Sequence, residues 1–133
     1  MNLCEGVSIM FVSMLKSKLH RAVVTGCMVD YEGSIEIDTS LMKAVGIVPY
    51  EKVLVANLAN GNRFETYAIP GKKDSGTIAL NGAAALLGKK GDLVIILSFM
   101  LMPVSKSAKH HPRILVLDKN NRPATKKKPA LKA

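Results

Sequence analysis

Apolar and polar residues alternate along several short stretches of the chain, which is the pattern of β-strands with one buried face. In Ile35–Asp38, for example, two isoleucines alternate with Glu36 and Asp38. Asn60-Gly61 separates two such stretches, and this dipeptide is the strongest short-range signal for a β-hairpin. The apolar pattern predicts further strands at Leu19–Thr25, Lys52–Leu58, Arg63–Ile69, Thr77–Leu80, Leu93–Met102 and Arg113–Asp118.

Two short segments have helical character. Leu41–Val45 is preceded by Thr39 and Ser40, either of which can cap a helix, and Gly46 ends it. Ala83–Leu87 is a second helical turn that Gly88 stops. Six or seven short strands with two short helices and no internal repeat favour a mainly β fold, a small β-barrel with helices at its rims. Such a barrel is a scaffold and does not by itself name a function.

The chain of 133 residues fits a single domain, and its formal charge of +9 invites a nucleic-acid-binding interpretation. The last 15 residues, however, hold six of the 19 basic side chains and no acidic one, so 13 basic residues face 10 acidic ones in the remainder. A Pro- and Lys-rich tail cannot bury enough apolar surface to fold. We therefore expect residues 119–133 to form a disordered basic tail, and residues 1–118 to carry nearly balanced charge.

The two cysteines, Cys4 and Cys27, form no metal-binding spacing, and the adjacent His110 and His111 would point to opposite faces of a strand. We expect no metal site and a reduced, cytoplasmic protein. The apolar run Leu93–Val104 is too short to span a bilayer, so no membrane association is expected.

The sequence Tyr31-Glu-Gly-Ser34 carries the sharpest chemical hypothesis. Glycine has no Cβ, so the Gly33 carbonyl can be approached closely and its backbone can be strained. The Ser34 hydroxyl can attack that carbonyl and move the acyl group from nitrogen to oxygen. Elimination of the ester leaves dehydroalanine, which hydrolyses to a pyruvoyl group. Taken alone, however, Gly-Ser is far more often an ordinary turn.

The surroundings of this dipeptide make the hypothesis specific. The stretches Met14–Thr25, Tyr31–Asp38, Asn60–Ile69 and Asn81–Ala85 resemble, in order and spacing, the aspartate 1-decarboxylase family. The resemblance spans roughly Met14 to Pro103 and implies a double-psi β-barrel that cleaves itself between Gly33 and Ser34. It also implies a homotetramer with active sites between subunits, and conversion of L-aspartate to β-alanine for pantothenate and coenzyme A synthesis. The family usually begins near Met14, so we expect residues 1–13 to be an extension outside the core and 14–118 to be the barrel domain.

The resemblance also assigns roles to single residues. Ser34 becomes the pyruvoyl group, which forms a Schiff base with the substrate and replaces pyridoxal phosphate as the electron sink, so that no external cofactor is needed. Gly33 supplies the cleaved carbonyl. Tyr67 donates a proton to Cα, and Asn81 stabilises an oxyanion or assists processing. The substrate-binding residues implied in this way are Lys18, His20, Arg63, Thr66, Gly82, Ala83 and Ala84.

Each of these residues could also have an ordinary structural role without any part in catalysis or binding. Arg63 can make a surface ion pair, Lys18 can be a solvated charge, His20 can be a packed core histidine, and Tyr67 can be a core aromatic. Asn81-Gly82 can be a plain turn. For the whole chain, two alternatives remain: a basic barrel that binds nucleic acid, and an inactive or unprocessed homologue that acts as a binding module. Few aromatic residues accompany the basic charge, which disfavours the first of these.

Overall fold

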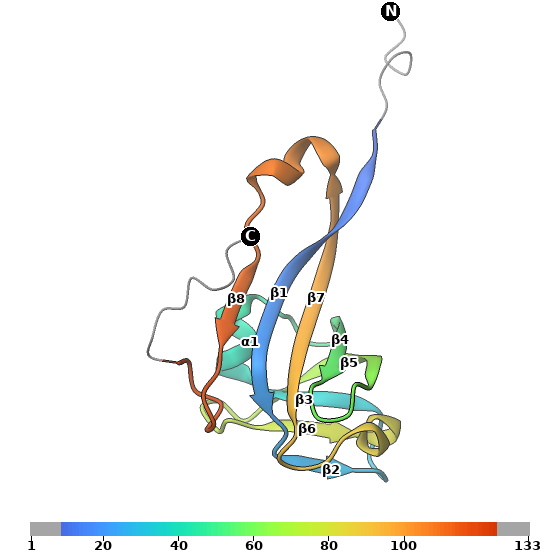
Figure 1. Cartoon of the computed structure of the whole chain (residues 1–133), viewed down its shortest axis with the longest axis vertical. Coiled ribbons are helices and arrows are strands. Elements are labelled where there is room, and N and C mark those ends of the chain that lie inside the picture. Colours follow the sequence, from blue (N-terminus) through green and yellow to red (C-terminus); the bar gives the residue numbers. More distant parts are fainter. Residues whose placement is uncertain (1–8, 125–133) are drawn as a thin grey trace, which may run out of the picture.

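The computed structural model describes residues 9–124, and the chain forms one eight-stranded sheet with short helices at its rims (Figure 1). The strands follow the order β2-β6-β3-β5-β4-β7-β1-β8 across the sheet. Three neighbouring pairs are parallel, β1 with β8, β2 with β6 and β3 with β5, and the other four are antiparallel. The elements are β1 Phe11–Val23, β2 Gly26–Met28, β3 Ser34–Asp38, α1 Thr39–Val45, β4 Lys52–Asn57, β5 Arg63–Gly71, β6 Ile78–Asn81, η1 Gly82–Leu87, β7 Leu93–Pro103, η2 Val104–Lys109 and β8 Arg113–Val116, where η denotes a 3-10 helix.

The sheet curves around an aliphatic core. Its fully buried side chains come from strands far apart in the sequence, among them Leu19, Ile35, Ile37, Val55 and Ile96. This agrees with the alternation seen in the sequence, because each strand turns every second side chain inward. The predicted fold class, mainly β with short helices, is confirmed, and the single eight-stranded sheet is consistent with a small β-barrel.

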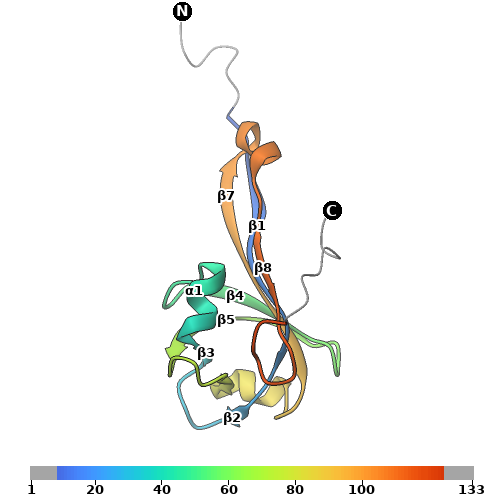
Figure 2. The same ribbon diagram turned by 90° about the vertical axis from the view of Figure 1, so that its left-hand side faces the viewer.

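β1 and β7 form a long antiparallel arm that projects from the barrel (Figures 1 and 2). The arm carries η2 near its far end, and β8 returns beside β1. The predicted strand at Leu19–Thr25 captured only the part of β1 inside the barrel. The strand starts at Phe11, which pairs with Pro103, so residues 11–13 of the expected N-terminal extension belong to the sheet. Residues 1–8, including Cys4, lie outside the described part.

The turns follow local sequence with one correction. Gly46 ends α1 in the left-handed conformation, as predicted, with φ of 80°. The N-cap is Asp38, not Thr39 or Ser40, and its carboxylate accepts the Ser40 N–H at 2.8 Å. Aspartate does this as well as Ser or Thr. The Asn60-Gly61 hairpin joins β4 and β5 through the five residues between them.

The C-terminal prediction was wrong over residues 119–124. Asn121 is buried, and its side chain makes three hydrogen bonds: it accepts from Val23 N at 2.7 Å and donates to Val23 O and Gly76 O at 2.8 Å each. These bonds stand in for a missing strand partner at the end of β1. The rest of the predicted basic tail, residues 125–133, lies outside the described residues. Within the described part, no helix is long and apolar enough to span a membrane.

Candidate active site

Strand register brings three predicted residues together. Ser34 is the first residue of β3 and pairs with Asn81, the last residue of β6. On its other side β3 runs parallel to β5, with Ile35 opposite Ala68. One residue earlier on both strands, Ser34 is therefore level with Tyr67. Ser34 thus lies between Asn81 and Tyr67 at the start of β3.

The Ser34 hydroxyl is held in a buried hydrogen-bonded position. The side-chain amide of Asn81 donates to Ser34 Oγ at 3.1 Å, and Oγ lies 3.5 Å from the Glu32 carbonyl oxygen, to which it donates. Both Ser34 and Asn81 are almost fully buried. Asn81 is also the N-cap residue of η1, but its side chain makes no capping bond because it points to Ser34 instead. The Asn81 amide therefore forms a hydrogen bond with Ser34 and does not cap η1.

The backbone at Gly33 is in very close contact with that at Gly82. A Cβ on Gly82 would lie only 2.6 Å from Gly33 Cα and 2.7 Å from Gly33 N, and the φ of Gly82 is +67°. Only glycine fits both the contact and the backbone conformation without strain. Gly33 is exposed while Ser34 is buried, so the bond between them crosses from the surface to the interior. This agrees with a glycine whose carbonyl must be approached closely.

A pocket of about 510 Å³ opens beside Ser34. This volume falls within the range of roughly 300–1,000 Å³ that is usual for small-molecule sites. Tyr67 enters the pocket from β5, and its ring centroid lies 6.3 Å from that of Tyr50. The lining residues are Asp30, Tyr31, Glu32, Ser34, Tyr50, Tyr67 and Ile69. Ser34, the predicted cleavage residue, and Tyr67, the predicted proton donor, therefore share one cavity.

Comparison with known proteins agrees with this geometry. The family model described as "Aspartate decarboxylase" matches residues 10–124. The chain belongs to the aspartate decarboxylase family. It is 50% identical over 113 residues to a protein of Geobacillus sp. (strain WCH70) named aspartate 1-decarboxylase, a match that covers 85% of this chain and 89% of the relative. Relatives of the same name from Caldicellulosiruptor bescii and Thermoanaerobacter pseudethanolicus are 53% and 49% identical, over 85% and 83% of this chain and 88% and 94% of theirs.

None of the seven residues that the family resemblance assigns to the substrate lines this pocket: Lys18, His20, Arg63, Thr66, Gly82, Ala83 and Ala84. Arg63 is exposed at the start of β5, opposite Ala56 of β4. Four residues of strand separate it from Tyr67, or about 13 Å at the backbone. Thr66 is half-buried next to Tyr67 and points to the other face of β5. Of the η1 residues, Gly82 and Ala84 are buried and Ala83 is exposed.

Lys18 and His20 lie together on β1, between β7 and β8. His20 Nδ1 is buried and has no hydrogen-bond partner among the described residues. Burial, followed by the nearby charges of Lys18 and Arg21, lowers the pKa of His20 below its ordinary value. The imidazole is therefore neutral at neutral pH. A neutral ring with a free nitrogen can still accept or donate one hydrogen bond to a bound molecule.

Five pocket residues were not predicted as site residues: Asp30, Tyr31, Glu32, Tyr50 and Ile69. Asp30, Tyr31 and Glu32 immediately precede the Gly33–Ser34 bond, so their position near the serine could have been read from the sequence. Tyr50 is brought in by the turn between α1 and β4, and no sequence signal places that turn against β5.

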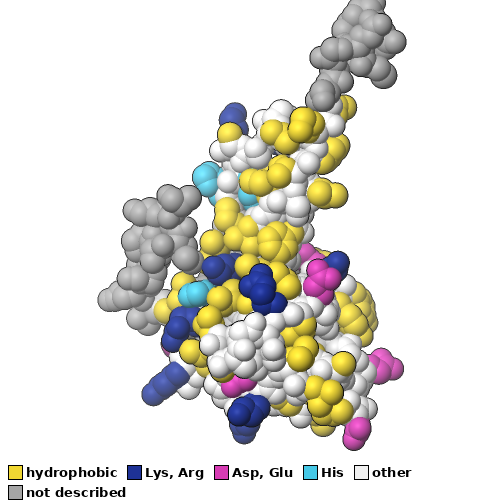
Figure 3. Space-filling model, turned by 45° about the vertical axis from the view of Figure 1, so that its right-hand side comes forward, with side chains coloured by type: hydrophobic (Ala, Val, Ile, Leu, Met, Phe, Trp, Pro, Cys, Tyr) yellow, Lys and Arg dark blue, Asp and Glu magenta, His cyan; other side chains and the backbone are white. Residues whose placement is uncertain are grey.

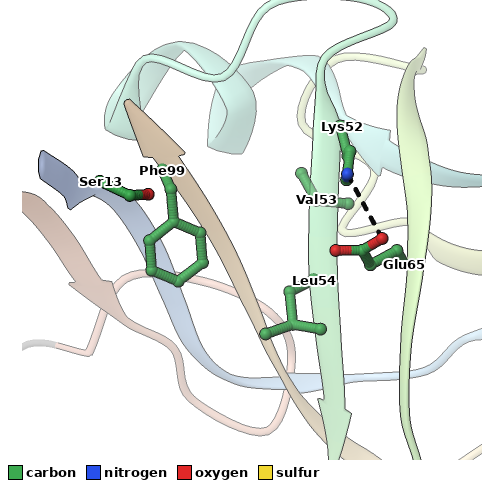
Figure 4. Close-up of a pocket in the computed structure, with 6 residues that line it drawn as sticks. All are labelled: Ser13, Lys52, Val53, Leu54, Glu65 and Phe99. Atoms are coloured by element: carbon green, nitrogen blue, oxygen red, sulfur yellow. Dashed lines mark ion pairs between the residues drawn. The ribbon is translucent and has the colours of Figure 1, made fainter. Parts of the chain in front are cut away.

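A second cavity of about 310 Å³ lies against β1, β4, β5 and β7 (Figure 4). Phe99 and Ser13 come from the arm, while Lys52 and Glu65 form an exposed ion pair of 3.3 Å on the opposite side. None of the predicted site residues lines it. Over residues 9–124, no group of three or more His, Cys, Asp or Glu side chains is arranged to hold a metal ion.

Proposed function

We propose that this chain converts L-aspartate to β-alanine and CO₂ by means of a pyruvoyl group made from its own Ser34. The observation that carries the proposal is the setting of Ser34: it is buried, hydrogen-bonded to Asn81, and shares a pocket with Tyr67. The choice of aspartate as substrate comes from the relatives of about 50% identity, which are named aspartate 1-decarboxylase. By the same likeness, β-alanine would feed pantothenate and coenzyme A synthesis in the cytoplasm.

The pyruvoyl group would arise by self-cleavage. Ser34 Oγ attacks the Gly33 carbonyl carbon, the Gly33–Ser34 C–N bond breaks, and the acyl group passes to oxygen as an ester. Loss of the Ser34 α-proton expels the Gly33 carboxylate and leaves dehydroalanine, whose hydrolysis releases ammonia. Asn81 orients Oγ for the attack, since its amide is the closest donor to that oxygen. Gly82, which has no side chain, allows its backbone to lie directly against Gly33.

The residues present fit such a group, because the buried position of Ser34 opens directly onto the 510 Å³ pocket. When formed, the pyruvoyl group supplies the electron sink for loss of the α-carboxylate, so neither pyridoxal phosphate nor a metal enters the proposal. The Tyr67 hydroxyl delivers a proton to Cα of the product. The Gly82–Ala84 turn contacts a substrate carboxylate through backbone N–H groups, and Arg63 binds a carboxylate through its planar guanidinium.

Lys18, His20, Arg63 and Thr66 do not line the pocket that holds Ser34 in the same chain. We propose that Arg63, Lys18 and His20 reach the pocket of a neighbouring subunit in a homotetramer, while Thr66 assists cleavage within its own chain. Exposed apolar residues on the arm support assembly, since hydrophobic side chains gather there (Figure 3). They include Phe11, Phe99, Leu101 and Val104, with 59%, 46%, 69% and 45% of their surface exposed.

Mass spectrometry of the purified protein tests the proposal. We expect fragments of 33 and 100 residues, the larger one lighter by one ammonia than a serine-ended chain, together with β-alanine formation from aspartate. Ser34→Ala should stay uncut and inactive because no nucleophile remains. A parent chain that stays uncut and binds ligands without turnover would support the binding-module alternative. A cleaved and active Ser34→Ala protein would refute the proposed chemistry.

A further inference from the structure

Tyr50 faces the proposed proton donor across the pocket. The two rings are tilted by 36° with centroids 6.3 Å apart, within the range of a packed aromatic pair. Tyr50 is 75% exposed, whereas Tyr67 is 36% exposed. The Tyr50 ring therefore lies beside the Tyr67 ring at the surface and contributes little to the core of the barrel.

The backbone at Tyr50 is held in an unfavourable conformation. Its φ of 72° lies in the left-handed region, which bulky side chains rarely adopt. Such a conformation persists only when its surroundings impose it, and these residues gather at functional sites. Here the constraint comes from β5: Tyr50 N donates to Ala68 O at 2.7 Å, and Ala68 N donates to Glu51 O at 2.9 Å. The turn is thus tied to the residue that directly follows Tyr67.

A partly buried ion pair holds the same turn from the other side. Lys16 Nζ lies 2.7 Å from both carboxylate oxygens of Glu51, and Val48 N donates to Glu51 Oε1 at 3.0 Å. The two side chains of the ion pair are only 26% and 16% exposed, so solvent screens them less than a surface pair. The ion pair between Lys16 and Glu51 therefore attaches the turn, which holds Tyr50, to strand β1.

We propose that Tyr50 is a positioning residue for the proposed decarboxylation: its ring restricts the Tyr67 ring and limits water at the Tyr67 hydroxyl. The inference rests on the proposed function, because it concerns the delivery of a proton to substrate held at Ser34. Proton delivery follows substrate capture, and the residues proposed to bind carboxylates lie elsewhere. Loss of the Tyr50 ring should therefore lower kcat more than it changes KM.

Two variants remove the ring without disturbing the backbone, Tyr50→Asn and Tyr50→Gly, because both residues accept a positive φ. Tyr50→Phe keeps the ring and removes only the hydroxyl. Leu58→Asn, at an exposed apolar position of the β4–β5 loop, is the matched control for loss of an apolar surface group. Rates are expressed per cleaved subunit, measured by intact mass, so that a change in self-cleavage does not enter kcat.

We expect Tyr50→Asn and Tyr50→Gly to lower kcat on the order of tenfold, less than the roughly 10²–10⁴-fold contribution of a complete general acid that Tyr67→Phe would remove. Borohydride should still trap aspartate on the large fragment of both variants. Tyr50→Phe and Leu58→Asn should both keep the parental kcat. Parental kcat in both ring-deleted variants, or equal losses in Tyr50→Phe and Tyr50→Asn, would overturn the inference. If the parent itself made no β-alanine, the proposed function would fail instead.

Discussion

At the scale of single residues, the contact between Gly33 and Gly82 is the most demanding feature of the site. In Gly82→Ala the new Cβ would lie 2.6 Å from Gly33 Cα, and its φ of +67° would be strained as well. We expect the Gly33–Ser34 bond to move away from Asn81 and self-cleavage to slow at least on the order of tenfold, as small misplacements of reacting groups do. The fraction of cut chain over time, measured by intact mass, gives the rate.

Gly26→Ala is the matched control for this change. A Cβ at Gly26 would meet nothing within 4 Å, so the same substitution there adds no contact. Thermal unfolding of both uncut proteins separates a local effect on cleavage from a loss of the fold. Equal cleavage rates in Gly82→Ala and Gly26→Ala would show that the close approach has no part in processing.

Asp38 links the site strand to the loop before β6, and its effect on stability depends on pH. Burial by itself would raise its pKa, but hydrogen bonds from Gly76, Ser40 and Asp74 outweigh burial and lower the pKa below its ordinary value. Because the folded state binds the proton less tightly than the unfolded chain, the carboxylate stabilises the fold above the ordinary pKa of aspartate. That stabilisation is lost as pH falls through the lowered pKa of the folded state.

In Asp38→Asn the amide nitrogen would replace Oδ2 and face the Gly76 N–H, which now donates to that oxygen at 2.8 Å. Leaving one buried donor unsatisfied costs about 1–3 kcal/mol. We expect the free energy of unfolding in urea to fall by that amount near pH 7 and to depend less on pH in the acid range. Asp74→Asn changes an exposed carboxylate nearby and should leave the profile of the parent. An Asp38→Asn profile parallel to that of the parent would contradict this account.

At the scale of elements, alternation of side chains predicted most strands inside the barrel, because burial of one face fixes the period of two, but it did not predict the three-residue strand β2. Ile35–Asp38 and the β4–β5 hairpin are examples. The same signal missed Phe11–Lys18 of β1, since the arm is held by its long pairing with β7 and much of it is exposed. Pairing between residues about 80 to 90 positions apart leaves no local pattern in the sequence.

The site shows the same division. Ser34, Asn81 and Gly82 could be predicted because they occur in recognisable local motifs, and strand register then brings them together. Tyr50 could not, because its place depends on two backbone bonds to β5 and on the ion pair between Lys16 and Glu51. The C-terminal boundary at residue 118 failed for a related reason: composition shows charge, but it does not show the three bonds of Asn121.

Those bonds lead to a prediction for the C-terminal segment. A chain that ends at Ala124 keeps every contact described above and should unfold at the parental Tm. Ending the chain at Asp118 removes Asn121, whose three hydrogen bonds are worth on the order of 1 kcal/mol each. Asn121→Gly deletes the same bonds while tolerating the φ of 58°. Thermal and urea unfolding should show both of these proteins destabilised, and parental stability in either would refute a structural role for Asn121.

At the scale of the whole molecule, one chain holds two parts of the proposed chemistry at separate places. Ser34 and Tyr67 line the pocket, while Arg63 is exposed outside it. The arm presents apolar side chains to solvent (Figure 3). Closed symmetric assembly would bury such a surface and would give every pocket the same neighbour. The proposed homotetramer therefore accounts for both features at once.

Mixing two impaired variants tests whether the site is shared. Ser34→Ala keeps Arg63 but makes no pyruvoyl group, and Arg63→Ala should cleave itself but bind aspartate weakly, since a charge-assisted hydrogen bond is worth about 1.5–3 kcal/mol. If Arg63 acts on a neighbouring subunit, an equal mixture refolded together contains intact sites wherever an Arg63→Ala pocket meets a Ser34→Ala neighbour. Random assembly places half of the pockets on the Arg63→Ala variant and gives half of those a Ser34→Ala neighbour, so about one quarter of parental activity should return.

The same proteins mixed without unfolding serve as the control, since their subunits have not exchanged. Activity that stays at the sum of the two variants after co-refolding would show that Arg63 acts within its own chain, and that the distance between Arg63 and the pocket is closed by movement of a single subunit.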